Sequence, residues 1–341
     1  MSTIRTEEEL EERLSRPNPA DVEFMRRLEG DLLILGVAGK MGPSLARRAR
    51  RAADEAGVRM RVVGVARFSN PRVREELEAA GVETIGADLL DDDQLRALPD
   101  FPNVIYMAAR KFGTTGNECL TWALNTYLPG RVAERFRRSR IVAFSSGNVY
   151  PLVPVAQGGP TEATPPDPVG EYAQSVLGRE RMFEYFSARY GTPVALLRLN
   201  YAIDLRYGVL VDIARRVYER RPVQLAMGMV NVIWQGDANS VALRALGLCE
   251  TPPAVLNVTG PETVSVRSLA RRFGERFGVE PIFEGTEAPT ALLSDASRCH
   301  RLFGYPEVSL EQMIEWVADW IRSGGALWDK PTHFEVRDGK F

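Results

Sequence analysis

Three glycines spaced three residues apart have a spacing that is typical of a phosphate-binding loop. They directly follow an apolar run of strand length at 32–35, and a helical pattern begins at Pro43. In such a strand–turn–helix unit the first glycine permits a tight turn, the second lets the backbone approach a pyrophosphate, and the third allows close helix–strand packing. The helix N-terminus then offers free N–H groups to the phosphates. The alternative is a turn that binds no ligand. The loop residues predicted to bind a dinucleotide are Gly36, Gly39, Lys40, Met41 and Gly42.

The second predicted strand, at 61–66, is followed by Arg67 and Ser69 and by no acid. An acid at this place binds the ribose hydroxyls of NAD, whereas an arginine favours the 2′-phosphate of NADP. Lys40 in the glycine loop would add a second cation. We therefore predict NADP in preference to NAD, with a merely solvated Arg67 as the alternative.

Further candidate residues follow the third and fourth predicted strands. Asp88 and Leu89 follow the third and are expected to meet the adenine edge of the cofactor. Ala108 and Ala109 follow the fourth, and their small side chains let a cofactor approach the backbone. Lys111 comes next and is unusual in this sequence, because nearly all the basic residues are arginines. The chain has four lysines: Lys40, Lys111, Lys330 and Lys340.

Alternating strands and helices must position these residues. The predicted strands lie at 31–35, 61–66, 83–85, 104–107, 141–145 and 193–199, and helical patterns between them include 71–80 and 117–137. Such alternation indicates an α/β fold, a doubly wound parallel sheet covered on both faces by right-handed crossovers. Ligands of such sheets lie at the carboxyl ends of the strands, where the candidate residues are.

The chain order also suggests a division into parts. Residues 1–30 read as two short helices with no evident chemistry, an arm that packs on the sheet or on another subunit. The predicted parts are an arm at 1–30, a dinucleotide-binding domain at 31–200 to which 231–260 returns, and a small C-terminal α/β substrate-binding part at 201–230 and 261–341.

Composition excludes several functional classes. The 43 basic and 45 acidic residues give no electrostatic basis for binding nucleic acid or an anionic membrane. No apolar run approaches the roughly 20 residues that span a bilayer, and a secretory signal pattern is absent. Three isolated cysteines, Cys119, Cys249 and Cys299, indicate the reducing cytoplasm. With only two histidines and no metal-like spacing, we predict no metal site.

From about residue 31 to 322 the sequence resembles the extended short-chain dehydrogenases/reductases, the NAD-dependent epimerase/dehydratase group. The resemblance is carried by the order and spacing of several short motifs. They are the glycine loop, the Asp88–Leu89 pair, the paired alanines, Asn125, the Ser-Ser-x-x-Val-Tyr motif at 145–150, the strand at 255–258 and the stretch at 295–305. It implies that Asn125 and Tyr172 also contact the cofactor.

That family carries out redox chemistry with a Ser or Thr, a Tyr, and a Lys four residues after the Tyr. The resemblance therefore implies catalytic roles for Ser146 and Tyr172, but Val176 stands at the lysine position. A tyrosine with a pKa near ~10 is ionised in roughly one molecule in a thousand at pH 7, and a nearby cation favours the phenolate. Val176 supplies no such charge.

Three interpretations follow from this loss. A substitute cation serves, with Lys111 as the first candidate and Arg110 or Arg179 as alternatives. Or the oxidised nicotinamide alone supplies the positive field, giving a slower enzyme. Or the protein binds its cofactor without turnover.

The resemblance also bears on substrate and assembly. The residues expected at the substrate are Ser146, Gly147, Asn148, Asn200 and Arg206. Nucleotide-sugar enzymes of the family carry a diphosphate-binding arginine where this chain has 227–231 without one, which favours a free sugar, sugar acid or lactone. An acid beside the serine, as in dehydratases, is also missing. The expected function is an NAD(P)-dependent oxidoreductase or epimerase of a sugar-like small molecule, and the alternative is a non-catalytic NAD(P)-binding sensor or scaffold. Helices at 117–137 and 172–190 are expected to form a homodimer.

Overall fold

A computed structural model describes residues 3–111 and 113–340. Its centre is a seven-stranded sheet in the order β12-β7-β5-β4-β1-β2-β3, in which every neighbouring pair is parallel. The strands are β1 (Leu32–Leu35), β2 (Val62–Ala66), β3 (Glu83–Gly86), β4 (Asn103–Tyr106), β5 (Arg140–Ser146), β7 (Val194–Leu199) and β12 (Ala254–Val258). The predicted doubly wound parallel sheet is confirmed.

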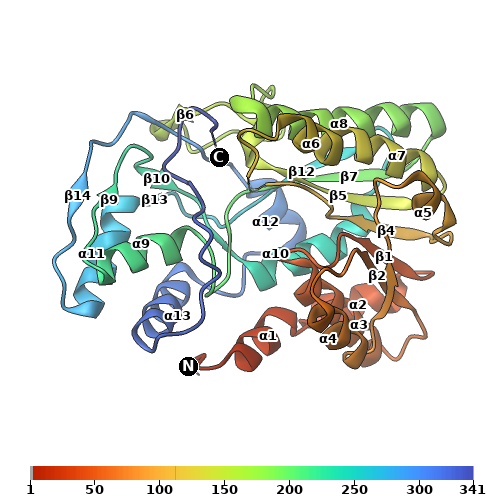
Figure 1. Cartoon of the computed structure of the whole chain (residues 1–341), viewed down its shortest axis with the longest axis horizontal. Helices are drawn as coiled ribbons and strands as arrows, with labels where there is room; N and C mark the ends of the chain where they lie inside the picture. Colours follow the sequence, from red (N-terminus) through yellow and green to blue (C-terminus); the bar gives the residue numbers. More distant parts are fainter. Residues whose placement is uncertain (1–2, 112, 341) are drawn as a thin grey trace.

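Helices cover both faces of this sheet (Figure 1). On one face lie α2 (Pro19–Arg27), α3 (Gly42–Ala56) and α10 (Gln235–Arg244), and on the other α5 (Asp92–Ala97), α7 (Leu128–Arg135) and α8 (Gly170–Tyr190). Three further helices complete this lobe: α4 (Pro71–Ala79), α6 (Glu118–Trp122) and α12 (Ser297–Phe303). The inner strands β1, β2 and β4 are buried throughout, as continuous apolar runs in a doubly covered sheet require.

A second, smaller lobe has its own apolar core, with Trp234 packed edge-on against Trp316. Its helices are α9 (Val209–Tyr218), α11 (Val266–Phe277) and α13 (Leu310–Arg322). Its short strand pairs are β8 (Ala202–Ile203) with β11 (Ile233–Trp234), β9 (Val223–Gln224) with β14 (Phe283–Glu284), β10 (Met229–Val230) with β13 (Val264–Ser265), and β6 (Val153–Pro154) with β15 (Thr290–Ala291). After α13 the chain runs back between the lobes and ends near β6 (Figure 1).

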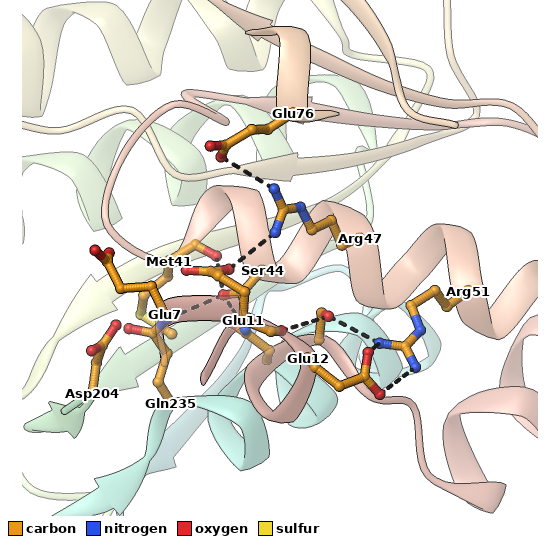
Figure 2. A network of polar contacts seen from close by, with 12 residues as sticks. Glu7, Glu11, Glu12, Met41, Ser44, Arg47, Arg51, Glu76, Asp204 and Gln235 are labelled. Atoms are coloured by element: carbon orange, nitrogen blue, oxygen red, sulfur yellow. Dashed lines mark hydrogen bonds and ion pairs between the residues drawn. The ribbon is translucent and has the colours of Figure 1, made fainter. Parts of the chain in front are cut away.

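The N-terminal arm joins the two lobes. Leu10 and Leu14 of α1 (Glu7–Ser15) are fully buried in the second core, whereas Met25 of α2 belongs to the core under the sheet. Figure 2 shows the polar side of this junction, where Arg47 of α3 lies between Glu11 and Glu76 at 3.4 and 3.2 Å. The arm therefore packs within its own chain. No helix among residues 3–111 and 113–340 is long and apolar enough to cross a membrane.

Candidate active site

A cavity of about 800 Å³ opens where the carboxyl ends of the central strands face the second lobe. Its walls combine the glycine loop, the ends of β5 and β7, the start of α8, the loop before α9, and the tail after α13. The predicted site residues that line it are Gly36, Gly39, Lys40, Met41, Gly42, Ala109, Lys111, Ser146, Asn148, Tyr172, Asn200 and Arg206. Segments far apart in sequence thus meet in one space, as the topology predicts.

The glycine loop has the geometry that a dinucleotide phosphate needs. Gly36 has φ +84°, and a Cβ on it would lie 2.6 Å from the backbone nitrogen of Ala108. A Cβ on Gly42 would lie 2.1 Å from the carbonyl oxygen of Val37. At Gly39 an added Cβ would meet only the oxygen of Gly36, at 3.3 Å, so this residue faces the open side. Since α3 begins at Gly42 with Pro43 in its first turn, the loop and helix N-terminus fit a cofactor pyrophosphate.

Ser146 and Tyr172 meet inside the cavity. The Ser146 Oγ lies 3.0 Å from Asn148 Oδ1 and accepts the N–H of Asn148 at 3.2 Å. Tyr172, in the first turn of α8, is 7% exposed. Burial raises the pKa of the Tyr172 phenol, and the Arg179 guanidinium and the Ser146 hydroxyl act in the opposite direction. A phenol beside a hydroxyl can move a substrate proton while the serine binds the same oxygen.

Val176, which stands at the position of the family lysine, also has apolar neighbours. Val176 is fully buried and packs with Val149, Tyr150 and Tyr172. The cation that acts on Tyr172 is instead Arg179, one helical turn further along α8. Arg179 was predicted only as an alternative substitute cation, because seven residues separate it from Tyr172.

Arg179 is a buried cation held by neutral groups. Its side chain is 4% exposed and lines the cavity. Nη1 donates to the carbonyl of Phe144 at 2.7 Å, and Nη2 donates to Asn125 Oδ1 at 2.9 Å. Within the described residues no carboxylate lies within 4 Å of this guanidinium. A buried charge without a counter-ion is costly, so it favours an anion such as a phenolate in the space beside it.

Asn125 requires a correction. Its carboxamide is fully buried in a π-helical turn at Ala123–Tyr127 and outside the cavity wall. Oδ1 accepts the N–H of Arg110, and Nδ2 donates to the Arg110 carbonyl and to Ser175 Oγ, at 2.9, 2.9 and 3.0 Å. These bonds use up the amide, so the contact with the cofactor predicted for Asn125 is wrong. Asn125 positions the loop after β4 and the guanidinium of Arg179.

Lys40 also lies elsewhere than predicted. Its ammonium crosses the cavity and donates to the carbonyl of Ala202 at 2.7 Å, above the ring of Tyr207 at 4.5 Å. It therefore faces the second lobe and not the end of β2, which removes it from the argument for a 2′-phosphate. Arg67 is exposed at the end of β2 and outside the cavity wall.

Four other predicted residues stand behind the cavity wall. Asp88 is half-buried, and its Oδ1 accepts the N–H of Leu90 at 3.0 Å. Leu89, predicted to meet the adenine edge of the cofactor, is buried in the core beneath the sheet and does not line the cavity. The backbone of Ala108 abuts Gly36. Gly147 is pressed between Asn200 and Ser294, where a Cβ would lie 3.2 and 3.1 Å from their side-chain atoms.

The two residues predicted after β7 differ in what they offer. Asn200 is 2% exposed and lines the cavity, and its buried Nδ2 has no hydrogen-bond partner among the described residues. Arg206 lines the cavity as well, but Asp204 and Glu11 each accept from its Nη2 at 2.7 Å. These bonds tie the arm to the second lobe, and the role in holding a substrate stays a prediction for the remaining Nη1.

The family is decided by a comparison of the whole chain with family models. The model of the NAD dependent epimerase/dehydratase family matches residues 32–224, more than half of the chain. The chain belongs to this family. No curated protein sequence matches it.

Solved structures of NAD-dependent epimerases resemble the whole fold. The Thermotoga maritima UDP-glucose 4-epimerase solved with UDP-glucose has a TM-score of 0.69 at 18% identity, and the Thermus thermophilus UDP-glucose 4-epimerase complex with NAD has 0.69 at 21%. The Campylobacter jejuni UDP-Glc/GlcNAc 4-epimerase has 0.71 at 22%. Each match covers 86% of this chain and 99% of the other. At these identities the likeness shows the shared fold.

Several residues that line the cavity were not predicted from the sequence. They are Glu11 of the arm, Asn70 and Glu76 beyond β2, Tyr201, and the tail residues Trp328, Lys330 and Thr332. Only Asn70 carried a local signal, the Asn-Pro pair that begins α4, where its Oδ1 accepts the N–H of Arg72. The arm and the tail reach the cavity only through the packing of the lobes.

Proposed function

We propose that this protein is an NAD-dependent oxidoreductase or epimerase that acts on a hydroxyl or carbonyl group of a small, sugar-like molecule. The observation that carries the proposal is the meeting of Ser146 and Tyr172 in the cavity that begins at the glycine loop. When bound, NAD supplies the hydride chemistry. Tyr172 would take the proton of the substrate hydroxyl or return it, and Ser146 would hold the same oxygen.

Arg179 would assist this proton transfer. Its positive charge favours the phenolate of Tyr172, which burial disfavours. Each unit by which a cation lowers the pKa of Tyr172 corresponds to about 1.4 kcal/mol. A cation that replaces the family lysine therefore raises the fraction of Tyr172 that is ionised. Lys111, the first candidate from the sequence, contacts the hydroxyl of Tyr207 at 3.3 Å and so suits a role at the substrate better.

NAD is preferred as the cofactor on two grounds. The family is NAD-dependent, and Lys40 no longer supports a 2′-phosphate. The NADP prediction now rests on Arg67 and Ser69 alone, and it is the alternative that a titration decides.

A substrate smaller than a nucleotide sugar is supported by the C-terminal tail. Arg337 donates to the carbonyls of Thr290 and Ala226 at 2.7 and 3.2 Å. With Val336 and Gly339 it closes the space next to Asn148, where only about 30 Å³ is left. The proposed substrate is therefore a free sugar, sugar acid or lactone, although the titles of the similar structures name UDP-sugars.

A non-catalytic NAD-binding sensor is the second candidate. It is favoured by the apolar surroundings of Val176 and by the burial that raises the pKa of Tyr172. Such a protein would bind NADH without turning over any sugar, sugar acid or lactone.

The first test is a fluorescence titration of the purified chain with NADH and NADPH. We expect NADH to bind at least about tenfold more tightly, a difference of about 1.4 kcal/mol. Tighter binding of NADPH would establish the alternative cofactor, and binding of neither would overturn the proposal. A screen of sugars, sugar acids and lactones follows, with the nicotinamide absorbance as readout, and a complete lack of turnover on NADH-binding protein would favour the sensor.

We also propose a homodimer through α6, α7 and α8. These helices and the π-helical turn at Ala123–Tyr127 pack on one another, and they carry the exposed side chains Leu120, Tyr127 and Tyr185, at 36, 54 and 53%. Light scattering is expected to give twice the chain mass, and Tyr185→Glu is expected to shift it toward the monomer, because a charge would be buried in the interface. Tyr218→Glu, at an exposed tyrosine of the second lobe, is the control. A monomeric wild-type chain would contradict the proposal.

A further inference from the structure

The lysines of this chain are concentrated in one place. The sequence has four lysines against 39 arginines, and Lys40, Lys111 and Lys330 all line the same cavity. Lys340 lies outside it and pairs with Asp338 on the surface. These three lysines come from the glycine loop, the loop after β4 and the tail, so the fold gathers them from distant segments.

Two of these ammonium groups converge on Tyr207. Lys40 Nζ lies 4.5 Å above its ring, and Lys111 Nζ lies 3.3 Å from its hydroxyl. Burial raises the pKa of Tyr207, so the phenol stays neutral. Around Lys40, no carboxylate of the described chain lies within 4 Å.

The buried cations at this end of the cavity repel one another, and an anion would stabilise them. Burial lowers the pKa of Lys40 to about 7; Asp204 opposes this shift, and Lys111 and Arg206 add to it. Burial lowers the pKa of Lys111 to about 8, and Asp212 opposes it. The carboxylate of Asp204 is already engaged by Arg206. A negative ligand would therefore relieve the repulsion between these ammonium groups.

Two further features of the same space favour an anion. The N-terminus of α9 opens at Gly208 and Val209 on the cavity wall, without a side-chain cap. Free N–H groups and the helix dipole attract negative charge there. Independently, Asn200 lines the same cavity, and its buried Nδ2 has no hydrogen-bond partner in the described chain.

We propose that Lys40, Lys111 and Tyr207 bind the carboxylate of the substrate, which makes the substrate class a sugar acid. This inference rests on the proposed function for its choice of a sugar-like molecule. A carboxylate fits because the Lys111 ammonium and the Tyr207 hydroxyl are adjacent, 3.3 Å apart, a separation that the two oxygens of one planar group can bridge. The glycine loop keeps its own N–H groups for the cofactor diphosphate.

The test is calorimetric binding to the full chain saturated with NADH. The probes are glucuronate and gluconate, with glucose as the neutral match and glucose 6-phosphate as the phosphate match. We expect a sugar acid to bind at least about tenfold more tightly than glucose. Lys40→Gln and Lys111→Gln should each remove most of this preference while glucose and NADH affinities stay within about threefold of the wild type. Lys340→Gln is the control and should behave as the wild type.

The pH dependence has a definite sign. Both lysines carry their charge below their pKa values of about 7 and 8, so sugar-acid affinity should fall as the pH rises through this range. Glucose binding should not change with it. The fall in sugar-acid affinity with pH should be weaker in the glutamine variants.

Several results would overturn the proposal. Equal affinity for sugar acid and glucose would do so, as would a preference for glucose 6-phosphate that depends on Lys40 and Lys111. A loss of NADH affinity in Lys40→Gln by about tenfold would assign that lysine to the cofactor diphosphate instead. Thermal unfolding of each variant separates these results from misfolding.

A second readout is independent of the cofactor. Acetylation near neutral pH, followed by peptide mass spectrometry, reports on each of the four lysines separately. A sugar acid should protect Lys40 and Lys111 and leave Lys340 unchanged, even if the chain binds no NADH and the proposed function fails. Equal labelling with and without the acid would refute the anion site by itself.

Discussion

Replacing Tyr172 by phenylalanine is expected to lower kcat by about a thousandfold, or roughly 4 kcal/mol, on whichever sugar acid or lactone the screen identifies. The substitution removes one hydroxyl from a residue that is 7% exposed and otherwise keeps its packing against Val176 and Tyr150. NADH affinity should stay nearly unchanged, because the glycine loop and α3 hold the cofactor independently. Steady-state kinetics and the NADH titration measure the two quantities separately.

A matched tyrosine controls for the loss of a hydroxyl. Tyr218 is 44% exposed on the second lobe, and Tyr218→Phe should leave kcat and KM at wild-type values. If Tyr172→Phe also retained the wild-type kcat, Tyr172 would not be the acid/base, and the Ser146–Tyr172 assignment would fail.

Removing the charge of Arg179 is expected to have the second largest effect, and its signature is in the pH profile. Arg179 lowers the pKa of Tyr172 against the effect of burial. For oxidation of a hydroxyl the phenolate is the active form, so the rate rises with pH through this pKa. In Arg179→Met the pKa of Tyr172 rises further, and the rising limb should move to higher pH. At neutral pH we expect a loss in kcat of about tenfold or more that shrinks as the pH is raised.

Arg179→Lys is the control for charge. A lysine keeps the cation while it loses part of the fork that binds Phe144 and Asn125, so its pH profile should stay closer to that of the wild type. Both variants also disturb these buried acceptors, and leaving one unpaired costs about 1–3 kcal/mol of stability. Denaturant unfolding measures this cost apart from the kinetics. A structural role alone would lower stability without moving the pH limb.

The same series discriminates between the two candidate cations. If Lys111→Met moves the pH limb and Arg179→Met does not, the substitute cation is the one first predicted from the sequence. If Lys111 binds a carboxylate, its loss raises KM for the acid and leaves the limb in place.

Local patterns allowed much of the fold and part of the site to be predicted from the amino-acid sequence. The glycine loop is a strand, a turn and a helix within about twenty residues, so steric requirements of neighbouring atoms specify it. The parallel sheet follows from the alternation of apolar strands with helices, and the placement of candidates after strand ends follows from the sheet. Ser146 and Tyr172 were recognisable because they match the short motifs of the family that the sequence resembles, and each stands at the start or end of such an element.

Tertiary structure decided which charges meet, because that depends on contacts between residues far apart in the chain. Lys40 is in the glycine loop, yet its ammonium binds a carbonyl 162 positions away in the second lobe. Arg206, a predicted substrate ligand, donates to Glu11, which lies 195 positions earlier in the chain. Asn125 loses its predicted cofactor contact to Arg110, Ser175 and Arg179 in the same way. A long, flexible side chain reaches several ångströms in any direction, and only packing of the arm, lobes and tail selects one partner from those within reach.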